Sequence, residues 1–158
     1  MLFRSIEASD CVLEIGPGIG SLTLAICEVA KSLIAVEIDS RLASILPRTL
    51  TTHGVNHDLF TIINKDAMLI DEELVGTPTA LVANLPYNVS VPVLLTVFEK
   101  LNSVSKGVVM VQSEVAERLY AQRGSKIYGA PTVKASWWME MSSAGSVSRS
   151  IFWPVPNV

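Results

Sequence analysis

The sequence is poor in the residues that build disulfide frameworks and metal sites. Its 158 residues include only two cysteines and two histidines. Cys11 and Cys27 stand at positions typical of a core, which indicates buried thiols in a reducing compartment. His53 and His57 are four residues apart, but the glycine and asparagine between them disfavour a helix, and no acidic or cysteine partner has matching spacing. We therefore expect neither a disulfide nor a metal.

Long apolar runs and an excess of basic residues are also missing. No stretch approaches the ~18–20 apolar residues of a membrane span, and the first ten residues lack a signal-peptide core. A net charge of −3 predicts weak non-specific affinity for a phosphate backbone. The basic residues gather late in the chain, where Arg118, Arg123 and Lys126 are candidates to flank the mouth of an RNA site. A solvated helix end and loop explain these three equally well.

The sequence is rich in apolar residues, which make up 49% of the chain and lie in alternating strand-like and helix-like runs. This alternation predicts one domain over residues 1–158, with a doubly wound α/β fold around a mostly parallel sheet. Pro47 is expected to disturb the last turn of its helix. The predicted strands are 11–15, 33–37, 59–63, 79–83 and 107–112, and the predicted helices are 19–30, 39–50, 90–101, 113–122 and 132–141.

A glycine-rich turn follows the first predicted strand. Residues 16–20 read G-P-G-I-G, and a buried helix comes next. Strand, turn and helix in this order open a nucleotide-binding unit, in which Gly16, Gly18 and Gly20 allow the backbone to approach a ligand. The compact G-x-G-x-G spacing differs from the dinucleotide pattern. It favours S-adenosylmethionine, which has no pyrophosphate to place at the helix N-terminus.

Acidic residues follow the next two strands. Glu37 lies roughly 20 residues beyond the glycines, where such folds place an acid against ribose hydroxyls. Asp66 lies just beyond the carboxyl end of the third strand, where it can accept a hydrogen bond from an adenine amino group or simply cap a helix. Ile38 and Ala67, next to these acids, belong to the same predicted cofactor site.

The fourth predicted strand leads into N-L-P-Y-N at residues 84–88. The Asn84 amide and the Leu85 carbonyl can accept hydrogen bonds from the exocyclic amine of a flipped adenine, and Tyr87 can stack on its face. Pro86 fixes its own φ and holds Leu85 extended. We assign all four residues to catalysis, and Asn84 also to the cofactor site; a plain strand followed by a proline turn is the alternative.

Together these motifs resemble the ribosomal RNA small-subunit adenine N6,N6-dimethyltransferase family. The resemblance rests on E-I-G-P-G at 14–18, V-E-I-D at 36–39, D-A-M at 66–68 and N-L-P-Y-N at 84–88, and it continues at 111–119, 125–129 and 152–158. It implies a Rossmann-like class I methyltransferase that uses S-adenosylmethionine. It further implies a cytoplasmic, metal-free, monomeric enzyme that dimethylates two adjacent adenosines near the 3′ end of small-subunit (16S) rRNA in immature small subunits.

The sequence also departs from the family. Relatives begin with a basic segment containing Q-N-F-L and continue into a last strand and a small helical domain. We therefore expect a catalytic domain that lacks both ends. Two other functions stay open: a large-subunit rRNA adenine methylase of the macrolide-resistance type, and a catalytically impaired module for ribosome assembly or binding. S-K-I-Y-G at 125–129 favours the small-subunit enzyme.

Overall fold

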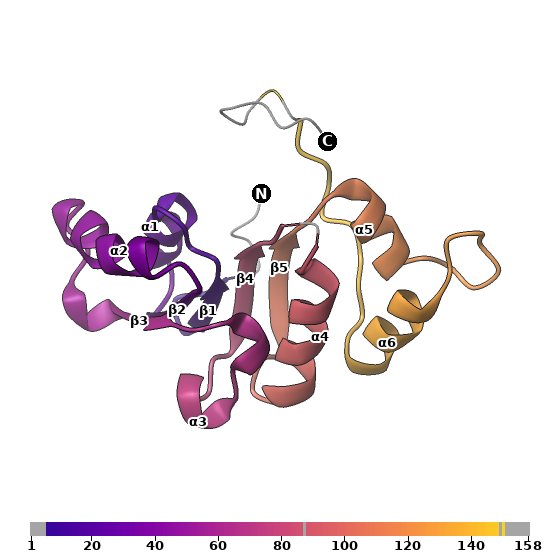
Figure 1. Ribbon diagram of the computed structural model, residues 1–158, viewed down its shortest axis with the longest axis horizontal. Coiled ribbons are helices and arrows are strands. Elements are labelled where there is room, and N and C mark those ends of the chain that lie inside the picture. The colour runs from indigo at the N-terminus through magenta and orange to yellow at the C-terminus, as the bar shows by residue number, and fades with distance from the viewer. Residues whose placement is uncertain (1–5, 87, 149, 151–158) are drawn as a thin grey trace.

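Five parallel strands form a single sheet in the computed structural model, which describes residues 6–86, 88–148 and 150. The strand order is β3-β2-β1-β4-β5, and every neighbouring pair is parallel (Figure 1). This arrangement confirms the predicted doubly wound α/β fold. The strands are β1 Cys11–Ile15, β2 Ser32–Glu37, β3 Phe60–Asn64, β4 Ala80–Asn84 and β5 Lys106–Met110.

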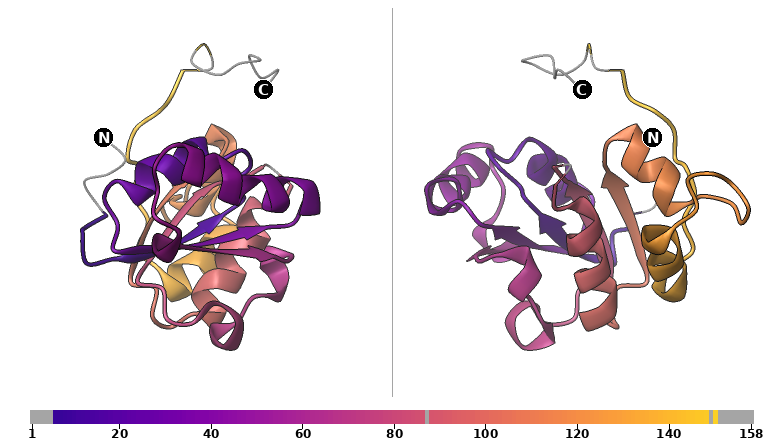
Figure 2. Two further views of the ribbon diagram at one scale, coloured as in Figure 1. Left: turned by 90° about the vertical axis from the view of Figure 1, so that its left-hand side faces the viewer. Right: turned by 45° about the vertical axis from the view of Figure 1, so that its right-hand side comes forward.

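Helices cover both faces of the sheet, as Figure 2 shows from the side. Successive strand residues point to opposite faces, so Val12 packs into one core and Leu13 into the other. The first core is covered by α1 Ser21–Cys27 and α2 Ser40–Thr52. The second is covered by α3 Glu72–Val75, α4 Ser90–Lys100, α5 Ser113–Leu119 and α6 Ala130–Trp138. Short 3₁₀ turns, η2 His57–Leu59 and η3 Ala67–Leu69, flank β3.

Helix α2 differs from its prediction, because Pro47 lies inside it and the helix continues to Thr52. A proline in a helix interior removes one backbone hydrogen bond. Leu46 and Leu50 are fully buried on the same face of α2. Their packing against the sheet holds the helix together in spite of the lost bond. At 13 residues α2 is the longest helix, and no helix within the described residues is long and apolar enough to cross a membrane.

A polar network ties three strands together at their amino ends. Lys106 Nζ lies 3.0 Å from the buried Asp10 carboxylate, and the Thr79 hydroxyl donates to the same carboxylate at 2.9 Å. The Cys11 N–H donates to the Thr79 hydroxyl at 3.1 Å. Burial works to raise the pKa of Asp10, but its hydrogen bonds outweigh burial and leave that pKa below the ordinary value. The network joins β1, β4 and β5 at the edge opposite to the predicted site.

Candidate functional site

The residues predicted to bind the cofactor lie along the carboxyl edge of the sheet. After β1 the chain turns to β2 on one side, whereas β4 lies on the other side of β1. The crevice at such a switch point is where doubly wound folds bind ligands. The strand order places the loop at 16–20 between the ends of β2 and β4, with the end of β3 beyond β2.

The three glycines of the loop have two different roles. All have positive φ, +70° at Gly16, +59° at Gly18 and +97° at Gly20, a region that favours glycine. A Cβ at Gly16 or Gly18 would meet nothing within 4 Å, so these two leave open space along the loop. A Cβ at Gly20 would lie 2.7 Å from Leu46 Cδ1. Gly20 therefore allows the loop to pack against α2, whereas the other two leave room for a ligand.

We expect Gly20→Ala to destabilise the fold by about 2–4 kcal/mol, because it combines an unfavourable φ with a steric clash in the core. Gly124→Ala is the matched control: Gly124 also has positive φ, +85°, but its Cβ would meet nothing within 4 Å. The control should lose only about 1 kcal/mol. Urea unfolding measures the free energy of unfolding of both variants. Equal losses of stability in the two variants would contradict a packing role for Gly20.

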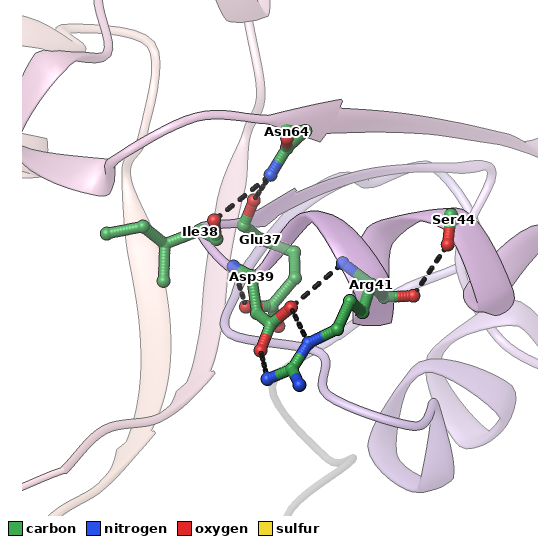
Figure 3. Close-up of polar contacts among 6 residues, drawn as sticks. All are labelled: Glu37, Ile38, Asp39, Arg41, Ser44 and Asn64. Atoms are coloured by element: carbon green, nitrogen blue, oxygen red, sulfur yellow. Dashed lines mark hydrogen bonds and ion pairs between the residues drawn. The ribbon is translucent and has the colours of Figure 1, made fainter.

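Glu37 holds the glycine loop in place. Its buried carboxylate accepts the Gly18 N–H at 3.1 Å through Oε2. It also accepts the Asp39 N–H at 2.9 Å through Oε1, near the centre of Figure 3. Asp39 in turn caps α2 and forms an ion pair with Arg41 at 2.9 Å. Hydrogen bonds from Arg41 lower the pKa of Asp39 to about 2, with the larger effect from its side chain and the smaller from its backbone N–H. A carboxylate oxygen has two lone pairs, so Glu37 can hold the loop and still accept a ribose hydroxyl.

Asp66 caps the 3₁₀ turn η3. Its Oδ1 accepts the Met68 N–H at 2.9 Å, which is the capping role that the sequence left open. The side chain is half-buried, and the neighbouring Ala67 is packed in the core. One carboxylate oxygen suffices for the cap, so an adenine-binding role for Asp66 stays a prediction.

The end of β4 presents two hydrogen-bond acceptors. Asn84 is exposed as the last residue of the strand. The Leu85 N–H donates to the Met110 carbonyl at 3.0 Å. The Pro86 carbonyl accepts the N–H groups of Val89, the N-cap of α4, and of Ser90, its first residue. Among the described residues, no backbone N–H donates to the Leu85 carbonyl. A catalytic role for the Asn84 amide and the Leu85 carbonyl stays a prediction, while Tyr87 lies outside the described residues, as does the motif at 152–158.

The three basic candidates are not gathered at one place. Arg118 forms an ion pair with Glu114 at 2.8 Å and lines a cavity of about 210 Å³ that also includes Asn88. Arg123 and Lys126 are exposed on the loop between α5 and α6, which projects from the right-hand side of the molecule in Figure 1. Of the three, only Arg118 therefore comes close to the segment that follows β4.

Glu14, part of the E-I-G-P-G motif, is a further candidate for the site, to which the sequence alone assigned no role. It is 1% exposed, and neither carboxylate oxygen has a hydrogen-bond partner among the described residues. Burial raises the pKa of Glu14 to about 7, and the negative charge of Glu37 adds to the rise, while the nearby Thr23 hydroxyl opposes it. A carboxylate within the apolar strand 11–15, two residues before the glycines, was the available signal.

The sequence profile of the family described as ribosomal RNA adenine dimethylase matches residues 4–158. A curated relative, the ribosomal RNA small subunit methyltransferase A of Streptomyces griseus, is 52% identical over 154 residues. The match covers 97% of this chain and 53% of the relative. The chain thus spans about half the length of the curated relatives that it matches.

Solved structures give a matching result. A dimethyladenosine transferase from Plasmodium falciparum superimposes with a TM-score of 0.83 at 31% identity, covering 97% of this chain and 54% of that one. The 23S rRNA methyltransferase ErmE superimposes with a TM-score of 0.78 at 26% identity, covering 97% and 59%. With a profile match over nearly every residue, a shared fold and the motifs at one edge of the sheet, the chain belongs to the ribosomal RNA adenine dimethylase family.

Proposed function

We propose that residues 1–158 form the catalytic methyltransferase domain of a small-subunit rRNA adenine N6,N6-dimethyltransferase. The substrate would be a pair of adjacent adenosines near the 3′ end of 16S rRNA in the immature small subunit. The chain would act as a monomer in the cytoplasm. One observation carries this proposal. Asn84 is exposed, and the Leu85 carbonyl accepts no backbone N–H from the described residues, at a strand end beside the glycine loop and the switch point of the sheet.

Positioning is what these residues contribute to the reaction. The adenine N6 is a poor nucleophile, because its lone pair is delocalised into the ring. Hydrogen bonds from N6–H to the Asn84 amide oxygen and the Leu85 carbonyl would hold the amine in one orientation, and alignment of this kind supplies much of the rate in a direct displacement. Pro86 restricts the backbone that carries both acceptors. Tyr87 is proposed to stack on the base.

S-adenosylmethionine fits the residues at the glycine loop and supplies an electrophilic methyl group when bound. Open space at Gly16 and Gly18 leaves room for the ligand, and the acidic residues Glu14 and Glu37 suit its net positive charge. Ile38 offers an exposed apolar side chain for a purine, and Asp66 offers its second carboxylate oxygen, Oδ2, which accepts no hydrogen bond from the described part of the chain. Among the described residues, no three histidine, cysteine or acidic side chains gather as metal ligands.

Glu37→Gln is expected to weaken S-adenosylmethionine binding by about tenfold or more, because one amide oxygen replaces two acceptor oxygens that hold the loop and the ribose. Isothermal titration calorimetry with the purified chain measures this. The exposed residue Glu99 gives the matched control, Glu99→Gln, which should bind like the wild type. Equal affinity of Glu37→Gln and wild type would remove Glu37 from the cofactor site.

The large-subunit methylase is the second candidate, favoured by the superposition on ErmE. The curated relatives at 51–54% identity, all named as small-subunit enzymes, favour the first. Incubation with S-adenosylmethionine labelled in its methyl group, and with ribosomes that lack both marks, separates the two. The rRNAs are then digested and the modified nucleosides identified by mass.

Dimethyladenosine in the 3′-end hairpin of 16S rRNA would support the proposal, and dimethyladenosine in 23S rRNA would support the alternative. A chain that binds small subunits and S-adenosylmethionine but transfers no methyl group would be an impaired binding module. A chain that binds neither would contradict all three functions.

A further inference from the structure

A side chain from β3 holds the end of β2 beyond the point where the strands pair. Asn64, the last residue of β3, stands opposite Glu37 in the sheet register. Its amide nitrogen donates to the Glu37 carbonyl at 2.7 Å and to the Ile38 carbonyl at 3.2 Å, as the upper part of Figure 3 shows. The Lys65 N–H donates to the same Glu37 carbonyl at 3.1 Å. Two successive carbonyls are therefore turned toward β3.

This contact sets the direction of two side chains at the end of β2. With both carbonyls held by Asn64, the peptide groups on either side of Ile38 have one orientation. The Glu37 carboxylate then points to the glycine loop, where it accepts the Gly18 N–H. The Ile38 side chain points away from the loop and from α2 and is 67% exposed (Figure 3).

Folding alone does not require an amide at this position. The Glu37 carbonyl, at a buried residue, already accepts the Lys65 N–H, and the Ile38 carbonyl belongs to an exposed residue, where water can satisfy it. Water does not impose a direction on a peptide group, whereas an amide donated from the neighbouring strand does. The contact is therefore better explained by the need to orient the segment at 37–38 than by the need to satisfy its carbonyls.

We propose that Asn64 is a positioning residue for the adenosine half of the cofactor. Its amide holds the segment at 37–38 so that the Glu37 carboxylate faces the ribose and Ile38 presents an apolar face to the purine. Asn64 itself touches no reacting atom. This inference rests on the proposed function, because it takes S-adenosylmethionine as the ligand of the carboxyl edge.

The test compares Asn64→Asp with Asn64→Gln by titration calorimetry. Aspartate has the shape of asparagine but places an oxygen against two carbonyls, whereas glutamine keeps the donor on a longer side chain. Each variant is titrated with S-adenosylmethionine and with 5′-methylthioadenosine, a neutral ligand that contains only the adenosine half. The new negative charge attracts a cationic ligand, so a weaker affinity cannot be ascribed to charge.

We expect Asn64→Asp to raise the Kd for both ligands by about tenfold or more and by a similar factor, since the loss is confined to the half they share. Asn64→Gln should recover most of the affinity. Asn56→Asp is the matched control: Asn56 is exposed and uses its oxygen to accept the Asp58 N–H, which aspartate also does. The thermal midpoints of all variants report whether the fold is kept.

Unchanged affinity of Asn64→Asp, beside a wild type that binds, would overturn the inference and leave the proposed function standing. A loss of affinity in Asn64→Gln as large as in Asn64→Asp would also overturn the inference, since keeping the amide N–H donor would then make no difference to binding. A wild type that binds neither ligand would overturn the inference and the cofactor of the proposed function together.

Discussion

Asn84→Ala is expected to lower the rate of adenine methylation about 100- to 1000-fold, the usual loss when one preorganised hydrogen-bonding group is removed from a reacting centre. Asn84 ends β4, and its side chain is exposed at the carboxyl edge. Without its amide oxygen, the adenine amine would be held by the Leu85 carbonyl alone. The ground-state affinity for S-adenosylmethionine should change less than tenfold, because Glu37 and the glycine loop are intact.

The measurement is the single-turnover rate of methyl transfer to small subunits, with the cofactor Kd from calorimetry beside it. Asn84→Asp retains an acceptor oxygen at this position and should lose less activity than Asn84→Ala. Asn102→Ala changes an exposed asparagine just beyond the C-terminal end of α4 and should match the wild type. If Asn84→Ala retains a rate within about threefold of wild type, another group must orient the amine.

Glu14→Gln is expected to stabilise the chain at pH 8 by about 3 kcal/mol, with most of this gain absent near pH 4.5. The pKa of Glu14 rises from an ordinary 4.5 to about 7 in the folded state, mainly through burial. The folded chain therefore holds a proton that the unfolded chain has released between these two pH values. The contribution of Glu14 to the free energy of unfolding therefore falls as the pH rises from 4.5 to 7. Above pH 7 the full cost of burying the charged carboxylate remains.

Urea unfolding of wild type and Glu14→Gln across pH 4.5–8 measures this difference. Glu28→Gln, an exposed glutamate at the end of α1, is the control and should show no such trend. A gain of equal size at pH 5 and pH 8 would show that Glu14 is not the titrating group. We further expect Glu14→Gln to bind S-adenosylmethionine more weakly, because it removes a buried negative charge beside the site of a cationic ligand.

The sequence alone determined the order of the elements and the chemistry of their ends. Apolar runs of strand length, each followed by glycine, acid or amide residues, predict parallel strands with functional loops, because connections between parallel strands bring their carboxyl ends to one edge. Gly16, Glu37, Asp66 and Asn84 could all be picked out in this way, since each lies at the end of its strand or within two residues beyond it. Element ends were predicted only to within a few residues, as for α1, which is shorter than 19–30.

Only the tertiary structure decided how these residues act on one another. Pro47 stays inside α2 because Leu46 and Leu50 are buried against the sheet, a distant contact that local propensity does not contain. Glu14 acquires its raised pKa because the fold buries it and brings the negative charge of Glu37 near it, in spite of the opposing effect of the Thr23 hydroxyl on α1. Asn64 reaches the carbonyl of Glu37, 27 residues earlier, because β2 and β3 pair in one register. Residue types and spacing determine which chemistry is present, whereas burial and strand register determine which groups meet and in what charge state.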